Sequence, residues 1–71
     1  MDRAVLEDHL AQAERHVAEG ARHVARQRER VVELKDHGHD WRAATKLLQA
    51  FEQMQAMHIA DRDRLRKQLS P

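Results

Sequence analysis

The sequence contains no cysteine, tyrosine or asparagine, and its only side-chain alcohols are Thr45 and the penultimate Ser70. Ser/His/Asp and Cys/His catalytic arrangements are therefore nearly unavailable to it. It has only two glycines, Gly20 and Gly38, so it also lacks the glycine-rich turn with which nucleotide-binding enzymes cradle phosphate. We therefore expect a protein that is not an enzyme, and we assign it no cofactor.

With 71 residues, the chain is short for a protein without covalent cross-links. A single domain of this size, residues 1–71, rarely gains more than a few kcal/mol of stability from its core. Disulfides cannot add to it, and the absence of cysteine fits a reducing compartment. No run approaches the roughly 20 apolar residues that span a bilayer, and the N-terminus lacks the apolar stretch of a signal peptide. We expect a cytoplasmic protein, with no membrane contact, that is stabilised by a partner.

An excess of charge of one sign is also missing, because 13 Lys and Arg residues stand against 12 Asp and Glu residues. Global charge therefore does not favour nucleic acid or an anionic membrane as a partner. Arg22, Arg26 and Arg30 form a row at four-residue steps that could bind phosphate. Acidic residues are interleaved with this row, which is typical of a solvated helix surface, so nucleic acid is not the expected partner.

Apolar residues recur at three- and four-residue steps in two long stretches, which predicts two amphipathic helices. We expect the first helix at about residues 2–36 and the second at about residues 41–69. The turn at residues 37–40 contains Gly38, suited to the left-handed conformation after a helix end, and Asp40, suited to cap the next helix. Because so short a connection forces the helices antiparallel, the sequence predicts an all-α antiparallel helical hairpin.

In this hairpin, residues whose numbers add up to about 77 should lie at the same level. Gly20 would then lie opposite Met57 and His58. We expect His58 to be buried in the space that Gly20 leaves and to fix the register of the helices. The alternative is that His58 is a pH switch or a ligand group. The same rule pairs His16 with Asp61.

The apolar sector of the second helix is about 200° wide at 100° per residue, which is more than one partner helix can cover. We therefore predict a homodimer in which two hairpins form a four-helix bundle with coiled-coil packing, although a different protein would serve equally as the partner. Two apolar margins could form the interface. One consists of Met57, Ala50, Val5 and Leu34, and the other of Ile59, Leu48, Val32 and Trp41.

Three segments carry a resemblance to other proteins: residues 14–20 (ERHVAEG), residues 26–28 (RQR) and residues 51–58 (FEQMQAMH). In these helix-face patterns the chain resembles a group of short, uncharacterised helical-hairpin proteins of high-GC proteobacteria. The resemblance covers most of the chain. It implies a bacterial origin and brings no function with it.

Histidine is unusually frequent, with six residues in 71. His9, His16 and His23 repeat every seven residues, which separates neighbours by about 10.5 Å, so no two of them can bind one metal ion without the second helix. The candidate metal ligands are His16, His23, His58 and Asp61, and a four-ligand site could form by duplication across a dimer. The alternative is that histidines at this spacing pack their rings along the edge of the core.

These features support two hypotheses about function. The first is a non-enzymatic module for protein–protein interaction or self-assembly, based on the wide apolar sector and the missing catalytic groups. The second is a His-rich metal-binding or metal-sensing protein.

Overall fold

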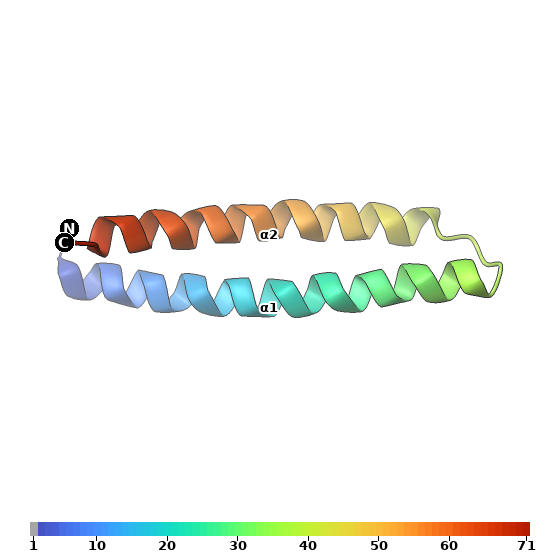
Figure 1. Ribbon diagram of the computed structural model, residues 1–71, viewed down its shortest axis with the longest axis horizontal. Coiled ribbons are helices and arrows are strands. Elements are labelled where there is room, and N and C mark those ends of the chain that lie inside the picture. Colours follow the sequence, from blue (N-terminus) through green and yellow to red (C-terminus); the bar gives the residue numbers. More distant parts are fainter. Residues whose placement is uncertain (1) are drawn as a thin grey trace.

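The computed structural model describes residues 2–71, which form two α-helices, α1 (Arg3–Asp36) and α2 (Arg42–Leu69). The helices lie side by side and antiparallel, and both chain ends lie at the same end of the molecule (Figure 1). The Cα atoms extend over 53 × 15 × 14 Å. The predicted all-α antiparallel hairpin is confirmed, and each helix begins one residue later than the sequence predicts.

The turn begins with a Schellman motif at the end of α1. The His39 N–H donates to the Leu34 carbonyl (2.9 Å), and the Gly38 N–H donates to the Lys35 carbonyl (3.2 Å). These two bonds satisfy carbonyls that the last helical turn leaves without a partner, and the motif requires a left-handed residue between them. Gly38 has a φ of 69°, so its predicted role is confirmed.

The start of α2 differs from the prediction, because the N-cap residue is Trp41 and not Asp40. The Asp40 carboxylate still accepts a hydrogen bond from the Arg42 N–H (3.0 Å), the first orphan donor of the helix. Asp40 accepts this bond from the turn, where it lies two positions before Arg42 in the sequence. The Trp41 ring lies beside α1, with Lys35 Nζ at 4.4 Å from its centroid, an arrangement that adds a cation–π interaction across the turn.

The contact between α1 and α2 follows a strict alternation of three- and four-residue steps, which is the repeat of coiled coils. We call these positions the inner seam, and all of them are buried or half-buried. In the part of the chain that the structure describes, only Ala13, Val24, Val31 and Leu65 are buried, each with an exposed fraction of 9% or less. The inner seam consists of Leu6, Leu10, Ala13, Val17, Gly20, Val24, Gln27, Val31 and Leu34 of α1, and of Ala44, Leu48, Phe51, Gln55, His58, Arg62, Leu65 and Leu69 of α2.

The predicted register is wrong by about two residues, because Gly20 faces Gln55 and facing residues therefore have numbers that add up to about 75 and not 77. His16 lies against His58, with ring centroids 5.2 Å apart, and lines one groove together with Asp61. The prediction assumed that the turn is symmetric, but the segment after Gly38 runs back along α1, so that α2 begins short of the level at which α1 ends (Figure 1). This return moves every residue of α2 relative to α1 by about 3 Å, at 1.5 Å per residue.

Gly20 therefore lies opposite Gln55, and His58 is half-buried, so the prediction of a buried His58 above Gly20 is wrong. Gln55 Nε2 donates to the Val17 carbonyl of α1 (2.8 Å). A Cβ atom on Gly20 would overlap Gln55 Oε1 and lie 2.8 Å from Gln55 Cδ. Within residues 2–71, the buried Oε1 of Gln55 accepts no hydrogen bond. Because Gly20 has no side chain, the Gln55 amide can occupy the space beside it.

We predict that the effect of Gly20→Ala on the free energy of unfolding depends on Gln55. In the Gln55→Ala background, Gly20→Ala should stabilise by about 1 kcal/mol, the difference in helix propensity. In the parent chain this gain should vanish, because the new Cβ displaces the amide and breaks a hydrogen bond worth about 0.5–1.5 kcal/mol.

Urea unfolding of the four proteins at one protein concentration gives the coupling energy. Ala18→Gly, at an exposed position of α1, is the control for helix propensity alone. Equal effects of Gly20→Ala in both backgrounds would show that Gln55 does not occupy this space.

Candidate functional site

Helix α2 carries a second row of apolar residues that α1 does not cover. We call it the outer seam, and it consists of Ala43, Leu47, Ala50, Met54 and Met57, again at alternating four- and three-residue steps. All five residues are exposed. The exposed fractions of the three large residues are 45% for Leu47, 54% for Met54 and 71% for Met57.

The position of the outer seam on α2 explains why α1 leaves it open. At 100° per residue, its centre lies about 100° around the helix from the centre of the inner seam. A single antiparallel neighbour covers a narrower sector, so a second neighbour is required to bury both seams. Angles near this value are found where one helix of a bundle contacts two others.

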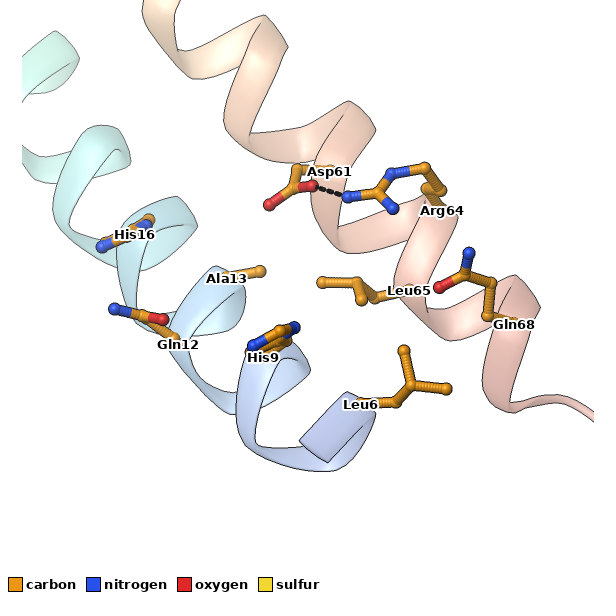
Figure 2. Close-up of a pocket in the computed structure, with 9 residues that line it drawn as sticks. All are labelled: Leu6, His9, Gln12, Ala13, His16, Asp61, Arg64, Leu65 and Gln68. Carbon is orange, nitrogen blue, oxygen red and sulfur yellow. Dashed lines mark hydrogen bonds and ion pairs between the residues drawn. The ribbon is translucent and has the colours of Figure 1, made fainter. Parts of the chain in front are cut away.

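Polar residues end the outer seam on the side of the chain termini. Beyond Met57 the same row continues with Asp61, Arg64 and Gln68. These three residues, together with His9 and other residues, line a groove between the helices, and Figure 2 shows Arg64 bonded to Asp61 at its edge. The apolar part of the row is therefore confined to the half of the hairpin next to the turn.

The opposite side of the hairpin is different in character. Two exposed ion pairs connect the helices there, Arg28 with Glu52 (3.3 Å) and Arg66 with Glu14 (3.2 Å). Ile59 is the exposed large apolar residue of α2 on this side. Of the two predicted margins, the one with Met57 and Ala50 is therefore the more continuous on α2. Leu34 and Leu48, which were assigned to the margins, lie half-buried in the inner seam.

The candidate metal ligands are distributed over this molecule in three different environments. His16 lies against His58, as described above. His23 lies against Phe51, with ring centroids 5.8 Å apart. Asp61 lines the same groove as His16 but is paired with Arg64 of its own helix (Figure 2).

Within residues 2–71, no group of three or more His, Cys, Asp or Glu side chains is placed to hold a metal ion. The His16–His58 pair is thus the part of the candidate site that one chain brings together. A site that includes residues of a second chain stays a prediction.

The sequence pattern predicts one apolar sector about 200° wide on the second helix and does not separate two seams within it. The signal was present in the spacing, because the steps from Ala43 to Met57 repeat the pattern of the inner seam one residue out of phase. Gln55 was also missed as an inner-seam residue, since a polar side chain does not contribute to an apolar pattern.

No protein-family model, curated protein or solved structure matches this chain. Neither helix has a stretch long and apolar enough to cross a membrane in the part of the chain that the structure describes. The exposed surfaces of the hairpin are therefore the guide to its function.

Proposed function

We propose that this chain is a non-enzymatic self-assembly module, in which two hairpins associate through the outer seam of α2 to form a four-helix bundle. The observation that carries this proposal is the exposure of Leu47, Met54 and Met57 in one regular row. Scattered apolar residues are normal on protein surfaces, whereas a contiguous row with helical spacing is typical of an interface.

The exposed area supports a partner of about the same size. The hairpin exposes 5524 Å², whereas a compact monomeric protein of 8.3 kDa is expected to expose about 4,600 Å². The excess of about 900 Å² is close to the roughly 800 Å² that each partner buries in a stable interface of standard size. A second copy of the hairpin would supply such a surface.

The composition of the inner seam also favours association. Four of its positions are polar, namely Gln27, Gln55, His58 and Arg62, and a fifth is Gly20. Burial of apolar area contributes about 25 cal/mol per Å², so these positions add little to the stability of the single hairpin. Association through the outer seam would bury apolar side chains that the single hairpin leaves in water.

We predict that the parent protein sediments as a dimer at micromolar concentration and that Leu47→Glu combined with Met54→Glu makes it monomeric, because two carboxylates cannot be buried unpaired in an apolar interface. Sedimentation equilibrium measures the mass. The control is Gln49→Glu combined with Gln53→Glu, which adds the same charge to exposed positions of α2 outside both seams. This control should remain dimeric.

A parent protein that sediments at 8.3 kDa, with a melting temperature independent of protein concentration, would contradict self-assembly. A different protein would then be the partner that contacts the outer seam. Loss of the dimer in the control as well would show that added charge, and not the outer seam, is responsible.

Metal binding is a second candidate function, and the His16–His58 pair is the observation in its favour. With a metal–nitrogen bond of about 2.0–2.1 Å and tetrahedral geometry, two imidazoles on one Zn²⁺ have ring centres about 5 Å apart. The two rings lie 5.2 Å apart and come from different helices. An ion held by both would cross-link α1 and α2, with water in the remaining coordination positions.

If this pair binds Zn²⁺, the ion should raise the melting temperature of protein prepared without a His tag, and a chelator should reverse the effect. Zinc at ten times its dissociation constant stabilises the folded state by about 1.4 kcal/mol. His16→Gln and His58→Gln should each abolish the shift, whereas the matched control His9→Gln should retain it. A shift that persists in His16→Gln would place the ion elsewhere, and the absence of any shift would remove this function.

A further inference from the structure

We infer that the outer seams of the two copies pair antiparallel and in one register, with Ala50 opposite the partner's Met54 and Leu47 opposite the partner's Met57. This inference rests on the proposed self-assembly and specifies how the second copy is seated. We base it on the way in which inner-seam residues of α1 and α2 face each other, on the length of the outer seam and on the charged residues at the ends of the outer seam.

The inner seam shows how two such rows fit together when the helices are antiparallel. Gly20 ends a three-residue step that begins at Val17, and it faces Gln55, which begins a three-residue step that ends at His58. In antiparallel rows, therefore, the residue that ends a three-residue step on one helix lies opposite the residue that begins a three-residue step on the other helix. This pairing also sets a small residue against a large one.

The outer seam allows few pairings of this kind with itself. Its short steps run from Leu47 to Ala50 and from Met54 to Met57. Pairing Ala50 with the partner's Met54 and Met57 with the partner's Leu47 satisfies the rule and, by two-fold symmetry, covers all four residues on both copies. The two large apolar residues of α2 that are most exposed in the single hairpin, Met57 and Met54, are both included.

Displacing the partner by one seven-residue repeat gives worse pairings in either direction. In one direction Met57, the most exposed of these residues, lies beyond the start of the partner's α2, at the level of the turn that contains the partner's Asp40. In the other direction Leu47 faces the partner's Arg64, and Ala50 faces the partner's Asp61. Each displacement leaves large apolar side chains against charges or beyond the end of the partner's helix, which costs free energy of desolvation. In the inferred register, by contrast, the outer-seam residue that faces a charge is the small Ala43, opposite the partner's Asp61.

The charges beyond the apolar row favour the same register. In it, Arg64 is level with the partner's Asp40, and symmetry repeats this pair at the other end of the interface. Both side chains are largely exposed in the single hairpin, where Arg64 pairs with Asp61 and Asp40 lies 3.7 Å from Arg42. A parallel arrangement would instead set Arg64 against Arg64 and Asp61 against Asp61. Such like-charge contacts suppress an orientation.

The register predicts distances that can be measured, because the two-fold axis then lies at the level of residue 52. Single cysteines introduced by Gln53→Cys or Lys67→Cys, both at exposed positions, can be labelled cleanly since the chain has no other cysteine. At 1.5 Å per residue, the two Gln53 positions are offset along the bundle by about 3 Å and the two Lys67 positions by about 45 Å. Pulsed electron paramagnetic resonance between nitroxide labels should give a short distance for the first and at least about 45 Å for the second.

The same experiment separates a wrong register from a failure of self-assembly. Short distances at both positions in a protein that sediments as a dimer would overturn the antiparallel pairing and leave the proposed function intact. A monomer by sedimentation would overturn both. In the Leu47→Glu, Met54→Glu background, the dipolar signal at both positions should disappear, and a signal that persists there would place the interface outside the outer seam.

Discussion

The register of the hairpin depends on one polar contact, the Gln55 amide over Gly20. Gln55 donates to the Val17 carbonyl, and its Oε1 occupies the volume that any side chain at position 20 would fill. A displacement of α2 by one repeat would set this amide against a side chain of α1, because Gly20 is the only glycine of the inner seam. Apolar contacts between two regular helices are nearly equivalent after such a displacement, whereas this hydrogen bond is not. A second glutamine makes the reciprocal contact from α1 to α2, because Gln27 Nε2 donates to the Ala44 carbonyl (2.9 Å).

This way of fixing the register has a consequence for where the apolar residues lie. Three consecutive inner-seam positions of α2 are polar, namely Gln55, His58 and Arg62, whereas the outer seam is apolar from Ala43 to Met57. The hairpin therefore has a specific but weakly apolar contact inside and a more apolar row outside. Polar groups in a core favour one arrangement over others more than they add stability. Folding and association are expected to be coupled in such a molecule, because the outer row contributes to stability only when it is covered.

Two histidines of α1 also contribute to the contact between the helices. His16 and His23 lie on the side of α1 that faces the groove along the inner seam, where they pack against His58 and Phe51. Ring packing of this kind accounts for their seven-residue spacing without a ligand. The close pair of His16 and His58 also brings two good metal donors of α1 and α2 together, so the structural role and the proposed metal-binding role concern the same two side chains.

The sequence by itself determined the two helices, the antiparallel hairpin and the turn at Gly38, because these depend on local periodicity and on backbone conformations that few residues other than glycine adopt. It also indicated that α2 has more apolar surface than one helix can cover. The tertiary structure decided the register, which brought Gln55 to Gly20 and His16 to His58, while Asp61 pairs with Arg64 of its own helix. It also decided which apolar residues of α2 stay exposed. These features could not be read from periodicity, because they depend on the asymmetric path of five residues between the helices and on the fit of one polar side chain. A shift of about 3 Å between two regular helices leaves the pattern of each unchanged.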